Sequence, residues 1–179
     1  MEHYYIGVDV GGTKIAFGLF DKEHRLITRS RIPSDREIDG PKLSALLLRQ
    51  CDLLLETASV PKAQLSGIGV AMPSYILQKE GRILKTSNLP NIRDFPMRDY
   101  LSCRTAAEVR LENDGNAAAL AEFHQGAGRG FEDMLYCPVS TGCSSAIVIN
   151  GHIFHGSYGW AGERGHALIT PGDGPYCGC

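Results

Sequence analysis

The chain has 179 residues and a formal net charge of -2, and its 43% hydrophobic and 21% charged residues allow a packed core and exclude a disordered chain. No basic excess favours nucleic-acid binding, no apolar run is long enough to span a membrane, and the first residues lack the features of a signal peptide. Because its 6 cysteines accompany no export signal, we expect reduced thiols and a cytoplasmic protein.

The N-terminal part of the chain predicts an α/β unit that opens with an antiparallel meander. Pro41 fits the first turn of a helix, and apolar residues at helical spacing continue that helix to Ala58. Segment 72–96 is rich in Pro, Gly, Asn and Ser, which predicts loops with one short strand near Ile83. We expect strands at 4–10, 15–20, 26–31 and 64–71, and a short helix at 97–102.

A glycine turn follows the first expected strand, in the segment Asp9–Lys14. Gly11 and Gly12 allow the backbone to approach phosphate oxygens, Thr13 adds a hydroxyl donor, and Lys14 adds a positive charge. The carboxylate of Asp9 can hold Mg²⁺ directly or through water. The segment is not a Walker motif, whose spacing differs.

The junction between a strand at 108–111 and an alanine-rich helix at 117–122 carries Asn113 and Asp114. Ligands of open α/β folds bind where strands end, and a helix N-terminus helps a carboxylate stay ionised. An ionised Asp114 can therefore accept a proton from a substrate hydroxyl. The alternative is that both residues only cap the helix.

A second meander is expected at 134–139, 145–149 and 152–154, with Asn150-Gly151 as a hairpin turn. The turn of small residues at 140–145, which contains Thr141 and Gly142, repeats the strand–turn–strand arrangement around 9–14. The repeat suggests two similar lobes facing one cleft, with each turn offering N–H groups to an anion. Ordinary hairpin turns explain the same composition.

Two further clusters lie near the end of the sequence. Glu163 and His166 can both bond the hydroxyls of a polyhydroxy ligand, or they form a surface salt bridge. His166, Cys177 and Cys179 are three potential zinc ligands, whereas a structural zinc site wants four. Free buried thiols are the competing interpretation. The tail is turn-rich, so we expect an N-terminal lobe at 1–112 and a second α/β lobe, at 113–179, that the chain leaves incomplete.

Three ordered motifs resemble the ROK family of sugar kinases: Asp9–Lys14, Glu112–Glu122, and Gly162–His166 followed by Cys177-Gly178-Cys179. The resemblance runs from Tyr4 to Cys179. It implies the two-lobed actin/hexokinase-like (ribonuclease H-like) α/β ATPase fold. It also implies ATP-dependent phosphorylation of a hexose or N-acetylhexosamine at the 6-hydroxyl, with Mg²⁺, structural Zn²⁺ and a dimeric full-length protein.

The resemblance also assigns roles to individual residues. Asp114 matches the catalytic base that deprotonates the sugar hydroxyl. The matching sugar ligands are Asn88, Asn113, Asp114, Glu163 and His166. The matching nucleotide-phosphate positions are Asp9, Gly11, Gly12, Thr13, Lys14, Thr141 and Gly142. His166, Cys177 and Cys179 match zinc ligands, and the fourth ligand is not in this chain.

Several positions depart from the family pattern. Serines and Cys143 replace glycines and an apolar residue around the second phosphate turn, Ser74 stands where glycine is common, and Arg164 adds a charge beside the sugar ligands. Two rival functions remain: a sugar-sensing regulator without its DNA-binding part, and a non-catalytic sugar-binding fragment. We expect little activity from the 179 residues alone.

Overall fold

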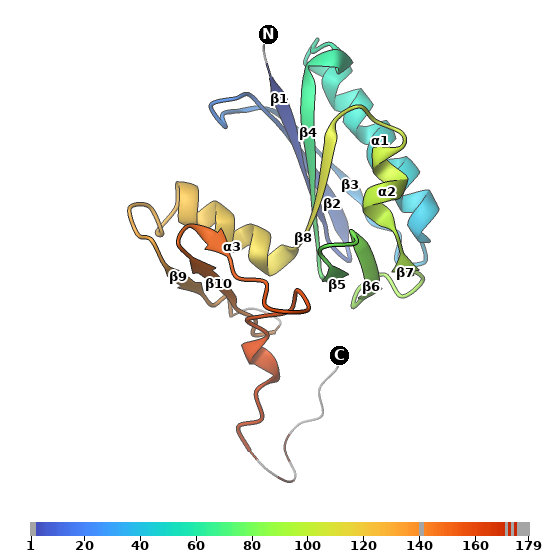
Figure 1. Ribbon diagram of the computed structural model, residues 1–179. Helices are drawn as coiled ribbons and strands as arrows, with labels where there is room; N and C mark the ends of the chain where they lie inside the picture. The colour runs from blue at the N-terminus through green and yellow to red at the C-terminus, as the bar shows by residue number, and fades with distance from the viewer. Residues whose placement is uncertain (1–2, 140–141, 171, 173, 175–179) are drawn as a thin grey trace. The chain divides into compact units, whose positions relative to one another are not determined.

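The computed structural model describes residues 3–139, 142–170, 172 and 174. The chain divides into two compact units, Met1–Asp114 and Gly115–Cys179. Figure 1 shows the helices and strands of both. Within the described ranges, none of the helices combines the length and the apolar character that a membrane crossing requires.

The first unit is built on a five-stranded sheet with the order β3-β2-β1-β4-β8. Its strands are β1 (Tyr4–Val10), β2 (Lys14–Phe20), β3 (Leu26–Pro33), β4 (Leu65–Met72) and β8 (Glu108–Asn113). The pairs β1–β2 and β2–β3 are antiparallel, which confirms the expected meander, whereas β1–β4 and β4–β8 are parallel. Three strands therefore bring their carboxyl ends to one edge of the sheet.

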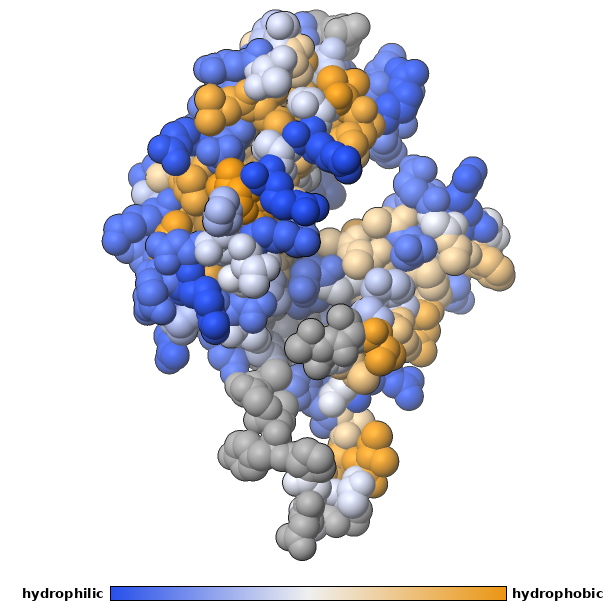
Figure 2. Space-filling model, turned by 180° about the vertical axis from the view of Figure 1, so that it is seen from behind, coloured by the Kyte–Doolittle hydropathy of each residue, from blue (hydrophilic) through white to orange (hydrophobic). Residues whose placement is uncertain are grey.

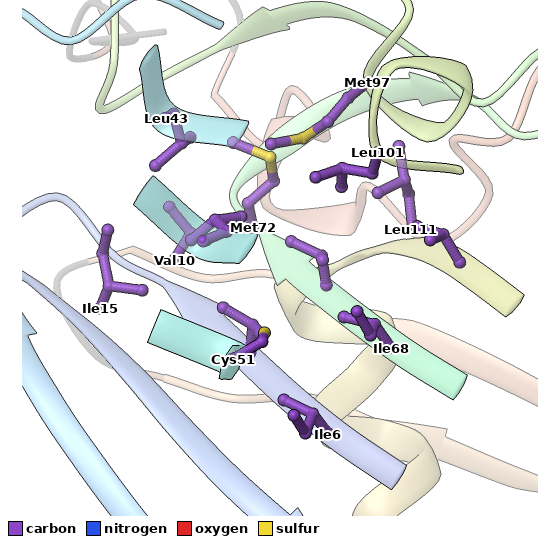
Figure 3. Packing of buried hydrophobic residues seen from close by; sticks show 14 of the residues in the cluster. Ile6, Val10, Ile15, Leu43, Cys51, Ile68, Met72, Met97, Leu101 and Leu111 are labelled. Atoms are coloured by element: carbon purple, nitrogen blue, oxygen red, sulfur yellow. The ribbon is translucent and has the colours of Figure 1, made fainter. Parts of the chain in front are cut away.

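Two helices, α1 (Gly40–Thr57) and α2 (Met97–Ser102), pack with one face of this sheet. The Asp39 carboxylate accepts the Lys42 N–H at 2.9 Å, and Pro41 lies in the first turn, so α1 begins where proline and a cap predict. Alternate residues of each strand enter the core, where they meet the apolar faces of both helices. Figure 3 shows Leu43, Cys51, Met97 and Leu101 against residues of the sheet.

Segment 72–96 contains the short strand expected near Ile83, but it also contains two strands where loops were predicted. This segment forms a second, three-stranded antiparallel sheet in the order β5-β6-β7, with strands β5 (Ser74–Leu77), β6 (Arg82–Thr86) and β7 (Arg93–Phe95). Ile76 and Ile83 pair across β5 and β6 and are both buried, so two apolar side chains hold the sheet against the core. Turn residues between these short strands dominate the composition of 72–96, so the alternation of apolar and polar residues within each strand is hard to detect in the sequence.

The second unit packs α3 (Asp114–Gln125) with a three-stranded sheet of order β11-β10-β9. Its strands are β9 (Met134–Tyr136), β10 (Ala146–Ile149) and β11 (His152–Ile153), which are shorter than predicted. Ala119 and Phe123 of α3 join Ala146 and Val148 of β10 in a small core. Two 3-10 turns, η1 (Lys62–Gln64) and η2 (Arg164–His166), complete the described elements.

Cys51 is a buried thiol in the core of the first unit, and its reactivity tests that placement. Burial raises the pKa of its thiol from 9.0 to about 12, so the thiol stays protonated at neutral pH. We expect iodoacetamide at mildly alkaline pH to modify exposed Cys103 and to leave Cys51 unmodified until the protein unfolds. The Cys51 thiol ionises at a lower pH in the unfolded protein than in the folded protein. This thiol therefore leaves the free energy of unfolding unchanged below pH 9.0 and lowers it as the pH rises toward about 12. Equal modification of the two thiols in the folded protein would contradict this placement.

Candidate functional site

The candidate site of the first unit lies at the carboxyl edge of its sheet. In the parallel register, Asp9 of β1 pairs with Ala71 of β4, and Ala71 pairs with Glu112 of β8. Paired residues of neighbouring strands share a face, so the two carboxylates lie on the same side of the sheet. Asn113 pairs one step further along, with Met72 at the end of β4.

The glycine turn between β1 and β2 begins at this edge. The N–H of Gly11 donates to the carbonyl of Lys14 at 2.9 Å, so this donor closes the turn and does not face an anion. The donors suited to a phosphate are therefore the N–H groups of Gly12 and Thr13, the Thr13 hydroxyl and the exposed Lys14 ammonium. A Cβ built on Gly12 would lie 3.0 Å from the Cβ of Asn88.

The loop after β6 holds Asn88 against this glycine turn. Buried Thr86 fixes the loop: its hydroxyl donates to the carbonyl of Leu89, and its oxygen accepts the N–H of Leu89, both at 2.8 Å. The N–H of Ser87 donates to the carbonyl of Pro73 at 3.3 Å, which ties the loop to the end of β4. The composition of 86–90 predicts a turn, but not its contact with Gly12.

The end of β8 is tied to the same region. The side-chain amide of Asn113 donates to the carbonyl of Ser74 at 3.4 Å. The carboxylate of Glu112 accepts the N–H of Asn113 at 2.9 Å and the side-chain amide of Gln78 at 3.1 Å. These bonds connect the strand–helix junction to β5 and to the turn that follows it. Sequence reasoning missed the contribution of Gln78.

Asp114 is the first residue of α3, and its side chain is exposed. Its place directly after Asn113, at the end of a parallel strand, is the position expected for a ligand-binding side chain in an open α/β sheet. The first unit thus brings Asp9, Gly12, Asn88, Asn113 and Asp114 to one edge of its sheet.

The second unit brings two other predicted segments together. A Cβ built on Gly165 would overlap the carbonyl of Cys143, and one built on Gly162 would lie 2.6 Å from the carbonyl of Ser145. The hydroxyl of Ser145 donates to the carbonyl of Gly162. The segment that carries Glu163 therefore packs closely on residues 143–145, which lie between exposed Gly142 and β10. Thr141, the other residue predicted for the second phosphate turn, lies outside the described residues.

Glu163 and His166 lie at η2, with 3.6 Å between the carboxylate Oε2 and the imidazole Nε2, and both side chains are more than a third exposed. The pair is close enough to bond one polyhydroxy ligand, and equally close enough for a surface ion pair. Arg164 between them is exposed. Cys177 and Cys179 lie outside the described residues, and among the residues described no group of three or more metal-ligating side chains occurs.

We expect Thr86→Val to loosen the loop that carries Asn88. Valine has nearly the shape of threonine, but it leaves the buried N–H and carbonyl of Leu89 without their side-chain partner, which costs about 1–3 kcal/mol of folding free energy. Thr57→Val is the matched control, because the Thr57 hydroxyl donates to Leu53 at an exposed position of α1. Urea unfolding of both variants measures the difference. Equal stability in the two variants would show that Thr86 does not hold the loop.

The sheet order, the glycine turn between the first two strands and the polar end of β8 together define a mixed α/β fold of the actin/hexokinase-like class. The chain belongs to the ROK family, which it matches over residues 5–179.

Three similar proteins illustrate this membership. Glucokinase of Halalkalibacterium halodurans is 36% identical over 178 residues, covering 99% of this chain and 54% of that protein. N-acetyl-D-glucosamine kinase of Pectobacterium atrosepticum is 36% identical over 169 residues, and the match covers 94% of this chain and 53% of the kinase. The structure of a ROK family glucokinase from Streptomyces griseus, in complex with glucose and AMPPNP, superposes with a TM-score of 0.78 at 31% identity, covering 98% of this chain and 54% of that one. The chain thus corresponds to the N-terminal portion of its relatives and spans about half of their length.

Proposed function

We propose that this chain is the N-terminal part of an ATP-dependent kinase that phosphorylates a hexose or N-acetylhexosamine at the 6-hydroxyl. The curated relatives include a glucokinase and an N-acetyl-D-glucosamine kinase, which supports a sugar substrate without choosing between the two kinds. We also propose the cytoplasm as the compartment and a dimer as the assembled form.

One observation supports this function above the others. A Cβ built on Gly12 of the turn after β1 would lie 3.0 Å from the Cβ of Asn88, so the two come close. Hydrogen bonds to the carbonyls of Pro73 and Ser74 connect the Asn88 loop to Asn113. A glycine turn suited to phosphate and two amides suited to sugar hydroxyls thus lie in one compact unit, which also carries the Asp114 carboxylate. Transfer of a phosphoryl group to an alcohol needs these two kinds of binding next to each other.

In this mechanism Asp114 accepts the proton of the 6-hydroxyl as that oxygen attacks the γ-phosphorus. One bond forms between the sugar oxygen and phosphorus, and the bond between phosphorus and the bridging oxygen breaks, so ADP leaves. Asn88 and Asn113 orient the sugar hydroxyls. The N–H groups of Gly12 and Thr13, with the Lys14 ammonium, bind the phosphate oxygens. Positioning and charge stabilisation supply most of the rate enhancement of such a transfer.

The implied cofactors fit the described residues to different degrees. Asp9 is an exposed carboxylate at the same sheet edge as the glycine turn, which suits a Mg²⁺ ion that neutralises charge on the nucleotide phosphates. For Zn²⁺, His166 is the described member of the predicted set, and it is paired with Glu163. Glu163 and His166 as sugar ligands, and Thr141 and Gly142 as phosphate contacts, remain predictions.

Titration of the chain with AMPPNP, glucose, N-acetylglucosamine and N-acetylmannosamine, together with coupled detection of ADP, tests the proposal. We expect binding of the nucleotide and of at least one sugar, and release of ADP only when both are present. Because the chain spans about half the length of its relatives, we propose that turnover by these residues alone is weak. Binding of the nucleotide and binding of the sugar are therefore the main measurements. Sugar binding without nucleotide binding would instead support a non-catalytic sugar-binding fragment, and binding of neither would reject both functions.

A further inference from the structure

Two aromatic side chains are exposed together on the loop that follows β11. Tyr158 is 72% exposed and Trp160 is 37% exposed. Their ring centroids lie 6.2 Å apart with 31° between the ring planes, which is contact distance for an aromatic pair. Single exposed apolar residues are normal on a protein surface, whereas a contiguous exposed patch often marks a binding site.

The loop that carries these rings is closed at its base. The N–H of Ala161 donates to the carbonyl of His155 at 3.1 Å. A Cβ built on Gly156 would lie 3.1 Å from the Cβ of Ala161, so the two ends of the loop are close together. Gly159, between the two aromatic residues, has a φ of 92°, which favours glycine. The loop is therefore a defined turn, which lowers the entropic cost of presenting the rings to a ligand.

The aromatic pair lies next to the segment that carries the candidate sugar ligands Glu163 and His166. Two residues separate Trp160 from Glu163 in the sequence, so the Cα atoms of these residues are at most about 11 Å apart. The hydroxyl of Ser145 donates to the carbonyl of Gly162, which fixes the connection between them. An aromatic surface and two hydroxyl-bonding side chains thus lie within one short stretch of the second unit.

This combination suits a carbohydrate that extends beyond one ring. A pyranose with equatorial hydroxyls presents C–H groups on its faces and hydroxyls around its rim. Its face can therefore pack on an aromatic ring while its rim bonds polar side chains. Ligand sites in general combine aromatic walls with a few placed polar groups. Hydrophobic and hydrophilic residues are intermixed on the surface of the second unit, as such a ligand requires (Figure 2).

We propose that Tyr158 and Trp160 form a binding subsite for a second pyranose ring, so that the protein accepts a disaccharide as well as a single hexose. Glu163 and His166 hold the first ring, which is the non-reducing one and carries the 6-hydroxyl that receives the phosphoryl group. The aromatic pair packs on the face of the second ring. This inference rests on the proposed function, because it uses Glu163 and His166 as sugar ligands.

The chain carries its own reporter for a test. Its sequence contains a single tryptophan, so fluorescence excited selectively in tryptophan comes from Trp160 alone. The 179-residue chain is titrated with glucose, with cellobiose, and with cellobiitol, in which the second ring is opened to a linear polyol. Calorimetry measures the three affinities, and fluorescence measures the effect of each sugar on Trp160. Coupled detection of ADP, with ATP present, is run in parallel.

We expect cellobiose to bind about three- to tenfold more tightly than glucose, the gain expected of one stacked aromatic contact, and to change the Trp160 fluorescence. Cellobiitol should bind about as tightly as glucose. Tyr158→Ala should lower the cellobiose affinity to that of glucose, whereas Tyr158→Phe, which keeps the ring, should retain the gain. Phe131→Ala is the matched control, because Phe131 is an aromatic residue of the same unit that is 66% exposed outside this loop.

Equal affinities for glucose and cellobiose would overturn the proposal and leave the kinase function standing. A gain that survives Tyr158→Ala, or that cellobiitol shares, would show that the second ring does not pack on the aromatic pair. Trp160 fluorescence that depends on protein concentration without sugar would show that a second copy covers the rings, which would also overturn the proposal. A retained gain without any ADP release would overturn the kinase function alone, and binding of neither sugar would overturn both.

Discussion

Asp114→Asn is expected to reduce sugar-dependent ADP release by about 10²–10⁴-fold, the usual contribution of a general base. Asparagine keeps the size and the hydrogen-bonding oxygen of the side chain but cannot accept the proton of the 6-hydroxyl. The loss should therefore fall on kcat, with the KM for sugar changed little, because the sugar still binds. A coupled assay of the active protein over a range of sugar concentrations separates the two constants.

The matched control for this substitution is Asp99→Asn. Asp99 lies in the first turn of α2 with a side chain that is 73% exposed, so the control makes the same chemical change at a helix start away from the strand end. We expect it to keep nearly full activity. Turnover by Asp114→Asn equal to that of the control would remove Asp114 from the role of base and leave it as a residue of the helix start.

Gly12→Ala is expected to weaken both nucleotide and sugar binding. The added Cβ would lie 3.0 Å from the Cβ and 3.1 Å from the Cγ of Asn88, closer than ordinary van der Waals contact, so the turn or the Asn88 side chain must shift. Displacement by an ångström at a site of this kind can lower activity by about 10²-fold. Titration with AMPPNP and with sugar measures the two effects separately.

Gly69→Ala provides the control for this second prediction. Gly69 lies on β4 of the same sheet, and a Cβ built there meets nothing within 4 Å. The control should keep both affinities. Should Gly12→Ala also keep both, the contact between the glycine turn and Asn88 has no part in binding.

Much of the first unit could be predicted because its signals are local. Pro41 and the apolar spacing that follows it locate α1, and the segment 97–102 coincides with α2. The alternation of apolar residues around Val109 located β8, although the strand continues to Asn113. These elements depend on residues close together in the sequence, whose periodicity is visible without a partner.

The contacts that organise the candidate site could not be predicted in the same way. The approach of Gly12 to Asn88 and the bond from Gln78 to Glu112 join segments that are distant in the sequence. Likewise, the short strand near Ile83 was predicted, but its pairing with β5 and β7 was not, because β5 and β7 are too short for their alternation to stand out from the surrounding turn residues. The family resemblance supplied roles for single residues but not the loop contacts that hold them.

Comparison of glucose with 6-deoxyglucose tests the central claim most directly. If phosphoryl transfer occurs at the 6-hydroxyl beside Asp114, the protein should release ADP with glucose, or with the N-acetylhexosamine that binds best, and the product should carry phosphate on oxygen 6. The corresponding 6-deoxy sugar should bind without releasing ADP. Equal ADP release with the 6-deoxy sugar, or a product phosphorylated at another oxygen, would contradict the account.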